Sequence, residues 1–384
     1  MLENNFGITS KATSISPFIT MDIMEKAQQL EKEGKDIIHL EVGEPDFETP
    51  QVIKKAAIEA IQRGDTHYTH SMGKIEFREE ISSYYQRKYQ VQISPEQIIV
   101  TSGTSPAMYL IFATILEPGD EVILSDPHYA CYPKIIRFLG GKPVFVPVYE
   151  ENGFKYDIEN IKKYITPKTK MIMVNSPANP TGTVYTEEDF QSITQLGYNV
   201  LSDEIYHGLV YKGKEHSMLE FTDRTFILDG FSKRYAMTGW RLGYLIAPKQ
   251  YVRPLQKIQQ NFFICANSFI QTAGMVALRE CDQDVKRMAD IYDQRRIYLL
   301  KRLNKIGIAS LSEPTGAFYA LANIKKHSQD SLKIALDVLE KALVAVTPGI
   351  DFGQNAEGYI RISYATSLEK IKEGMNRLER YFIK

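Results

Sequence analysis

The sequence lacks an excess of charge of either sign. Its 384 residues include 46 Lys and Arg against 47 Asp and Glu, which leaves a net charge of −1. Nucleic acids and anionic membranes attract proteins through concentrated positive charge, and the chain has neither a basic tract nor an acidic tail. We therefore expect a small-molecule ligand rather than nucleic acid or a membrane. A hydrophobic content of 43% is enough for a sizeable buried core.

Cysteine is scarce as well. Cys131, Cys265 and Cys281 form no C-x-x-C pair and are odd in number, which argues against a disulfide framework and against a zinc site. The amino terminus shows no charged-then-apolar signal pattern, and the uncharged stretch at 258–278 is interrupted by Gln and Asn, so it is not expected to span a bilayer. These absences predict a cytoplasmic protein without a metal site.

Short β-rich apolar runs are the main feature of the middle of the chain. Most are separated by helical periodicity, as in the segment after 104, where Ser105 is the expected N-cap and Pro106 the first helical residue. Such alternation predicts an α/β fold in which helices cover both faces of a mostly parallel seven-stranded sheet, in three α/β/α layers. The seven expected strands lie at 97–102, 121–126, 142–148, 170–176, 198–203, 225–230 and 243–248.

The pattern changes after Leu278, where long charged amphipathic helices alternate with isolated strands. This predicts a second, smaller α+β domain. We expect an N-terminal segment (1–42) that packs with the small domain, a large domain (43–283) and a small C-terminal domain (284–384).

The ligand of an open parallel sheet binds at the carboxyl ends of its strands. After the first run, Gly103, Thr104 and Ser105 precede a helix, where free backbone N–H groups and hydroxyls suit an anion, although an ordinary capped turn is the alternative. This segment also approximates the G-x-S-x-G elbow of serine hydrolases. Pro106 argues against that function, because the residue after such a serine must donate a backbone N–H.

Polar and aromatic residues end three further runs. Tyr129 offers an aromatic face for a planar ligand, although a lone tyrosine is more often core or loop packing. Asn179 offers an amide, and a simple turn is the alternative there. Asp203 and Tyr206 follow the fifth run, and a charged residue at the end of a buried strand is costly without a partner, which favours a functional role. The nearby His207 gives only weak spacing for a metal.

Lys233 and Arg241 flank the chain's only tryptophan, after the sixth run. A lysine is a nucleophile only when neutral, and a nearby cation and partial desolvation lower its pKa. Lys233 could then hold a carbonyl group while Arg241 binds an anion of the same ligand. Two solvated surface charges are the alternative, and the commoner one.

Five motifs in order carry a resemblance to a known family. They are VGEPDF (42–47), NPTG (179–182), SDEIY (202–206), SKRYAMTGWRLGY (232–244) and RISYA (361–365). From about Ser14 onward the chain resembles the class I, aspartate-type aminotransferases, which are fold-type I enzymes dependent on pyridoxal 5'-phosphate. The resemblance implies a ping-pong transfer of an amino group from an L-α-amino acid to a 2-oxo acid such as 2-oxoglutarate.

The resemblance also implies roles for single residues around the cofactor. Lys233 would form the internal aldimine and later serve as general base, while Asp203 would pair with the pyridine nitrogen. Tyr206 and Asn179 would hydrogen-bond the ring hydroxyl, and Tyr129 would stack on the ring.

The remaining implied roles concern the cofactor phosphate, the substrate α-carboxylate and the partner subunit. Arg241 and the turn 103–105, which comprises Gly103, Thr104 and Ser105, would bind the cofactor phosphate. Arg361 would bind the substrate α-carboxylate, with Asn179 and Gly43 beside it. Tyr68 resembles the tyrosine that reaches the neighbouring subunit's cofactor, which implies a homodimer with shared active sites.

Some features of the chain leave alternatives open. Many relatives have a serine phosphate ligand where this chain has Gly230, and Tyr129 stands where aspartate-type enzymes often have tryptophan. The same residues would serve a carbon–sulfur or cyclising lyase, and a non-catalytic regulator of this fold is a further alternative. No pattern selects a second cation for a dicarboxylate substrate among Lys11, Lys74 and Arg234.

Overall fold

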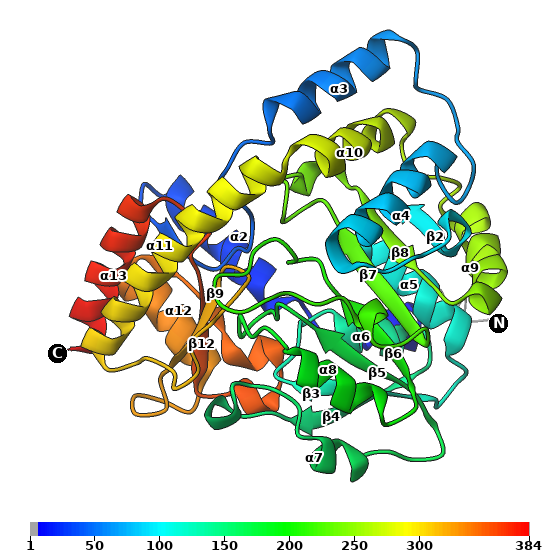
Figure 1. The fold of residues 1–384 in the computed structure, drawn as a ribbon. Coiled ribbons are helices and arrows are strands. Elements are labelled where there is room, and N and C mark those ends of the chain that lie inside the picture. Colours follow the sequence, from blue (N-terminus) through cyan, green and yellow to red (C-terminus); the bar gives the residue numbers. More distant parts are fainter. Residues whose placement is uncertain (1–6, 384) are drawn as a thin grey trace, which may run out of the picture.

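The computed structural model describes residues 7–383, and a seven-stranded sheet forms its centre (Figure 1). Each predicted run forms one strand, and the spatial order is β2-β8-β7-β6-β5-β3-β4. Only β8 is antiparallel to its neighbours, so the prediction of a mostly parallel sheet is confirmed. The bounds are β2 Ile98–Thr101, β3 Glu121–Asp126, β4 Lys142–Pro147, β5 Thr169–Asn175, β6 Asn199–Asp203, β7 Thr225–Gly230 and β8 Gly243–Ile246.

Alternate residues of these strands face two separate apolar layers. Ile99, Leu201 and Leu228 pack with α5 (Thr104–Ile115), α6 (Tyr132–Phe138) and α9 (Lys249–Phe262). The strand residues between them pack with helices of the opposite face, which include α4 (Ile75–Tyr89), α8 (Glu187–Thr194) and α10 (Ser268–Glu280). Because side chains alternate across a strand, apolar runs without polar gaps are buried on both faces. The predicted three-layer arrangement is therefore confirmed.

The start of α5 differs from the expected one. The helix begins at Thr104 with Gly103 as N-cap, and no side chain caps it, so the predicted Ser105 cap was wrong. Gly103 has φ +97°, and a Cβ there would lie 2.5 Å from Nη2 of Arg241. Glycine permits both the backbone conformation and this close approach. The first N–H groups of the helix consequently have no intrahelical or capping partner.

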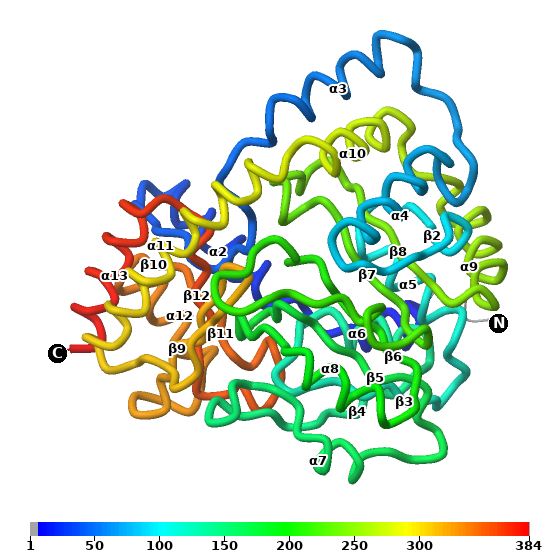
Figure 2. Tube along the Cα trace, viewed as in Figure 1, coloured from blue at the N-terminus to red at the C-terminus, as the bar shows by residue number. Residues whose placement is uncertain are grey.

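A smaller antiparallel sheet lies beside the large one, in the order β11-β12-β9 (Figure 2). Its strands are β9 Tyr319–Asn323, β11 Thr347–Pro348 and β12 Tyr359–Ser363. The helices near it are α11 Asp282–Ile306, α12 Ser331–Ala342 and α13 Leu368–Phe382. This part of the chain has the α+β architecture expected after Leu278.

The N-terminal segment contacts this C-terminal part. Strand β1 (Ile38–His39) pairs in parallel with β10 (Val344–Ala345), and α2 (Ile19–Lys32) packs nearby. The predicted domain boundary at 283/284 falls in the first turn of α11 and stays a prediction. Two further helices, α1 (Ser10–Thr13) and α3 (Gln51–Gln62), precede the large sheet in the chain; α3 lies over α10 at the edge of the molecule (Figure 1). Within residues 7–383 no helix is long and apolar enough to cross a bilayer.

Candidate active site

A cavity of about 620 Å³ lies where the carboxyl ends of the large sheet's strands meet the N-terminal segment and the small sheet. It brings together most of the residues that the sequence singles out, although they are far apart in the chain. Its lining includes Gly43, Thr104, Ser105, Tyr129, Asn179, Asp203, Tyr206, Lys233, Arg241 and Arg361. Gly103 is not part of the lining. It precedes Thr104 in the chain and packs against Arg241, and both of these residues line the cavity.

Lys233 lies in the turn after β7, and its amine faces this cavity. Its Nζ donates a hydrogen bond to the carbonyl oxygen of Gly43 at 2.6 Å. Burial and the positive charges of Arg361 and Arg241 together lower the pKa of Lys233 to about 8, although the carboxylate of Glu44 opposes the change. More of this amine is therefore neutral, and nucleophilic, near neutral pH than of an ordinary lysine.

Asp203 ends β6 and is buried in the same cavity. The Tyr132 hydroxyl donates to its Oδ2 at 2.7 Å, and the Ile205 N–H donates to its Oδ1 at 3.2 Å. Burial raises the pKa of Asp203 to about 6, although both hydrogen bonds oppose the rise. A buried carboxylate of this kind is stabilised by any cation that binds beside it.

The neighbouring Glu204 does not line the cavity. Its Oε1 accepts hydrogen bonds from the Ser202 hydroxyl at 2.9 Å and the Met218 N–H at 3.0 Å. Its carboxylate is thus part of a separate buried network that also approaches His207. Among residues 7–383, no three His, Cys, Asp or Glu side chains are grouped so as to hold a metal ion.

Arg361 reaches the cavity from β12 of the small sheet and is 2% exposed. Its Nη1 donates to Oδ1 of Asn179 at 2.9 Å. Its Nη2 donates to the hydroxyl of Thr347 at 3.1 Å and to the carbonyl oxygen of Glu41, whereas its Nε has no partner. A buried guanidinium with an unsatisfied N–H is a ready site for a carboxylate.

Tyr206 lies close to a residue that the sequence analysis did not select. Its hydroxyl lies 2.8 Å from the hydroxyl of Tyr319, which comes from β9. A Cβ on Gly43 would overlap the Tyr319 hydroxyl. Glycine at position 43 therefore lets the backbone that accepts the Lys233 hydrogen bond approach Tyr319.

An anion cradle lies at the rim, where the N-terminus of α5 meets Arg241. Arg241 has a left-handed backbone (φ 56°) and is exposed, and its Nη1 donates to the carbonyl oxygen of Thr238 at 3.0 Å. The free N–H groups of Thr104 and Ser105, together with the positive end of the helix, favour an anion beside this guanidinium.

The packing around Gly230 explains why a larger residue is disfavoured there. Gly230 pairs with Gly243 of β8. A Cβ on Gly230 would lie 3.0 Å from Cδ1 of Ile205 and 3.1 Å from the carbonyl oxygen of Leu242. A serine here would displace its neighbours, so Arg241 and the α5 terminus are the groups at this rim that suit an anion.

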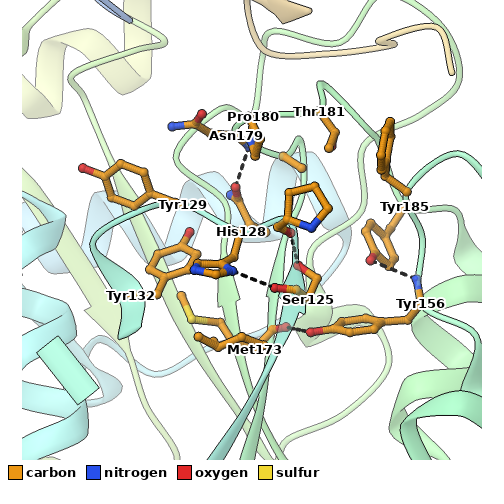
Figure 3. Close-up of a pocket in the computed structure, with 15 residues that line it drawn as sticks. Ser125, His128, Tyr129, Tyr132, Tyr156, Met173, Asn179, Pro180, Thr181 and Tyr185 are labelled. Carbon is orange, nitrogen blue, oxygen red and sulfur yellow. Dashed lines mark hydrogen bonds between the residues drawn. The ribbon is translucent and has the colours of Figure 1, made fainter. Parts of the chain in front are cut away.

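Tyr129 is half-buried and contributes one wall of the cavity. It contacts Tyr132 edge to face, with ring centroids 5.3 Å apart. Figure 3 shows Tyr129, Tyr132 and Asn179 around a small neighbouring void of about 20 Å³, which has room for about one water molecule. The aromatic wall is thus backed by packed protein, which favours a fixed orientation of the Tyr129 ring.

Four residues from the sequence analysis lie elsewhere. Tyr68 is 83% exposed and does not line the cavity. None of the three suggested cations lines it either: Lys11 lies over the Phe138 ring, Lys74 pairs with Asp65, and Arg234 donates to the carbonyl oxygen of His207. Within the described part of this chain, no cation beyond Lys233, Arg241 and Arg361 lines the cavity.

Sequence reasoning missed several residues of the site, namely Phe18, Glu44, Tyr132, Asn175 and Tyr319. Asn175 ends β5, and the strand-end argument that selected Asp203 could have found it. Tyr132 and Tyr319 lie within a helix and a strand, where a buried tyrosine looks like ordinary core. No pattern in the sequence distinguishes them.

The fold and this site are those of a fold-type I transferase. The chain superposes on the aspartate aminotransferase of Thermus thermophilus, solved with maleate, with a TM-score of 0.94, at 36% identity and over 97% of this chain and 99% of that one. It is 41% identical to the (5-formylfuran-3-yl)methyl phosphate transaminase of Methanocaldococcus jannaschii, over 98% of this chain and 100% of the relative. It is also 41% identical to an aspartate aminotransferase of Pyrococcus horikoshii, over 94% and 93% of the two chains.

Residues 35–378 match the model of the family described as aminotransferase class I and II. The chain belongs to this family and is a transaminase, an enzyme whose substrates are amino acids and oxo acids. The predicted family, fold class and enzyme class are therefore confirmed.

The family uses pyridoxal 5'-phosphate, and the residues present fit that group. The free N–H groups of α5 and the Arg241 guanidinium suit a phosphate, and the amine of Lys233, with its lowered pKa, suits an aldehyde. The buried carboxylate of Asp203 suits a protonated pyridine nitrogen. Each reactive part of the cofactor thus has a chemically matched partner in one cavity.

Proposed function

We propose that this enzyme binds pyridoxal 5'-phosphate and transfers the amino group of an L-α-amino acid to a 2-oxo acid, with 2-oxoglutarate as the acceptor, in two half-reactions of ping-pong type. The observation that carries the proposal is the cavity that joins the amine of Lys233 to Asp203 and Arg361. The amine feels the charges of two carboxylates and two guanidinium groups, which suits a group that alternates between nucleophile and base.

In this proposal, Lys233 would hold the cofactor aldehyde. Once the substrate amine has replaced it, Lys233 would remove the proton from the substrate α-carbon and deliver it to the cofactor carbon that carried the aldehyde. Asp203 keeps the pyridine nitrogen protonated, and Tyr206 and Asn179 donate to the ring hydroxyl. Arg241 with Gly103, Thr104 and Ser105 binds the phosphate. When bound, the cofactor supplies an electron sink for the carbanion that forms at the α-carbon.

The proposal places the substrate between the two sheets. Arg361 binds its α-carboxylate through the planar fork of the guanidinium, with Asn179 and Gly43 beside it. Tyr129 covers the ring of the cofactor. The hydrogen bond between Arg361 and Asn179 supports this arrangement, because it already holds the guanidinium in one plane.

The test is a panel of amino acids with 2-oxoglutarate, in which both the new oxo acid and glutamate are measured. Equal amounts of the two products are expected. Release of ammonia or of a thiol, without glutamate, would favour the alternative of a lyase with the same residues.

Arg361→Lys is expected to weaken amino-acid binding and to leave the affinity for the cofactor nearly unchanged. The lysine keeps the charge but loses the two-pronged geometry, and hydrogen bonds to charged groups contribute about 1.5–3 kcal/mol each. The KM of the amino donor should therefore rise about 10- to 100-fold, at 1.4 kcal/mol per tenfold. The measurement is KM for several donors beside cofactor titration, and an unchanged KM for every good donor would contradict the role.

We also propose a cytoplasmic homodimer with shared active sites. Exposed apolar side chains support an interface: Tyr68 is 83% exposed, Phe262 66%, Ile58 55% and Ile264 50%. Tyr68 would reach the phosphate of the partner's cofactor. The three free cysteines fit a reducing compartment.

Subunit mixing tests the shared site. The double variant Tyr68→Ala/Lys233→Ala is mixed with wild type, and heterodimers are isolated by means of two affinity tags. They are expected to have no intact site, because one site lacks Lys233 and the other lacks Tyr68. Heterodimers of wild type with Lys233→Ala alone are the control and should retain half of the wild-type activity. If the double variant also leaves half, Tyr68 does not serve the partner's site.

A further inference from the structure

Tyr319 lies at the centre of the proposed site, although nothing in the proposed mechanism uses it. It comes from β9 of the small sheet and is 2% exposed. Its hydroxyl occupies the space that a side chain at position 43 would need, and its ring lies against Arg361. A polar group placed this deeply requires a partner, because leaving it unpaired is costly.

The partner of the Tyr319 hydroxyl is the hydroxyl of Tyr206, 2.8 Å away, and either oxygen can be the donor. Burial raises the pKa of both phenols above the ordinary value, so both stay protonated near neutral pH. If the Tyr206 hydroxyl donates a hydrogen bond to the ring oxygen of the cofactor, its own oxygen can only accept the hydrogen bond from Tyr319. The bond between the tyrosines then runs in one direction, from Tyr319 to Tyr206.

The other contact of Tyr319 is with the substrate-binding cation. The guanidinium carbon of Arg361 lies 4.3 Å from the centre of the Tyr319 ring and 4.8 Å from the centre of the Phe352 ring. Guanidinium groups stack favourably on aromatic faces. These two rings restrict the plane of the guanidinium, while its Nη atoms bond to protein acceptors.

We propose that Tyr319 is a positioning residue which orients two groups at once: its hydroxyl directs the Tyr206 phenol at the cofactor ring oxygen, and its ring holds the Arg361 guanidinium for the substrate carboxylate. This inference rests on the proposed function. It links the small sheet to the turn after β6, and so makes the alignment of Tyr206 depend on how β9 lies against the large sheet.

The two actions reside in different parts of the side chain, so two substitutions separate them. Tyr319→Phe removes the hydroxyl and keeps the ring, whereas Tyr319→Leu removes both. Tyr85→Phe is the matched control, because it deletes an equally buried hydroxyl of α4 that has no hydrogen-bond partner. Each protein is loaded with pyridoxal 5'-phosphate, and the visible absorption band of the bound cofactor is titrated with pH.

In Tyr319→Phe, the pH midpoint of the band is expected to rise by about half a unit, which is the effect of losing one neutral hydrogen bond. The physical reason is that a poorly oriented Tyr206 stabilises negative charge on the cofactor ring oxygen less. The deprotonated form of the bound cofactor then appears only at a higher pH. Tyr206→Phe should raise the midpoint more. The KM of the amino donor should stay near the wild-type value in Tyr319→Phe and rise about tenfold in Tyr319→Leu, which loses the stacking.

Other outcomes would overturn the inference. A Tyr319→Phe band that titrates like wild type would remove the link to Tyr206, and an equal shift in Tyr85→Phe would reduce the effect to a general loss of packing. An unchanged KM in Tyr319→Leu would remove the action of the ring on Arg361. If that variant does not fold, Tyr319→Met takes its place, because methionine fills irregular space without an aromatic face. A wild-type protein without any cofactor band would instead contradict the proposed function, so the two failures are distinguishable.

Discussion

Lys233→Ala is expected to abolish the visible band of the lysine-bound cofactor and to lower transamination by about four orders of magnitude, the upper end of what a positioned general base contributes. In the structure, the Lys233 amine lies 2.6 Å from the Gly43 carbonyl oxygen, and its pKa is lowered to about 8 by burial and by Arg361 and Arg241. No other lysine among the described residues lines the cavity, so no other amine is placed to replace it.

The variant should still bind some cofactor, because the α5 terminus and Arg241 retain their contacts with the phosphate. The measurements are the absorption spectrum after saturation with pyridoxal 5'-phosphate, the amount of cofactor retained, and turnover. Lys162→Ala, on the exposed surface, is the control and should match wild type. A wild-type protein that shows no band after saturation would refute the reading of the whole site.

Asp203→Ala is expected to keep the cofactor and its bond to Lys233, while transamination falls by about two to three orders of magnitude. An adjacent opposite charge shifts a pKa by about 1–3 units, and each unit corresponds to about 1.4 kcal/mol. Loss of the carboxylate therefore removes up to about 4 kcal/mol of stabilisation from the protonated pyridine ring. Most of this raises the activation free energy for forming the carbanion, and about 1.4 kcal/mol corresponds to a tenfold lower rate.

Two further variants separate charge from shape at this position. Asp203→Asn keeps an acceptor for the Tyr132 hydroxyl but removes the charge, so it should behave like the Ala variant. Asp203→Glu keeps the charge at a shifted distance and should lose much less. The measurement is the single-turnover rate of α-proton loss. If this rate is the same in Asp203→Ala and wild type, Asp203 is not the partner of the pyridine nitrogen.

The stability of the cofactor-free protein checks that these variants are folded. Burial raises the pKa of Asp203 from 3.8 to about 6, so ionising it costs folding free energy. The cost starts as the pH rises above the unfolded value near 4 and is complete above about 6. Cofactor-free Asp203→Asn should therefore unfold at a higher temperature than wild type above pH 6, and the difference should disappear near pH 4.

Glu204, next in the chain, is not an alternative partner in this structure. Its Oε1 is held by the Ser202 and Ser217 hydroxyls and the Met218 N–H, away from the cavity. The resemblance to the family selected Asp203, and of these two carboxylates only that of Asp203 lines the cavity. Successive side chains at the end of a strand point to opposite faces of the sheet, so the two carboxylates diverge.

The local pattern of the sequence was sufficient for the large sheet. Apolar runs of four to seven residues can only be buried on both faces, and their alternation with helices requires a mostly parallel arrangement. The same reasoning placed Asp203, Lys233 and Asn179 at the ends of strands, and parallel strands bring such ends to one edge. The positions of these three residues could be predicted without information on contacts between distant parts of the chain.

Other features depended on contacts between distant parts of the chain. The helix α5 begins one residue before its expected cap, and its actual N-cap, Gly103, packs against Arg241, which is 138 positions further along. Arg234 was a candidate substrate cation by sequence, yet its side chain turns away and bonds to the His207 carbonyl oxygen. Whether a charged side chain faces a cavity or a buried partner is decided by the surrounding fold.

The sequence by itself determined the strands of the large sheet, their mostly parallel arrangement and the family motifs, because these follow from periodicity and from short segments of fixed spacing. Only the tertiary structure decided which tyrosines belong to the site. Tyr132 meets Asp203 across 71 positions, and Tyr319 meets Tyr206 across 113. A hydroxyl acquires its role from the partner within about 3 Å, and in these two cases the partner lies on another element, which no local pattern specifies.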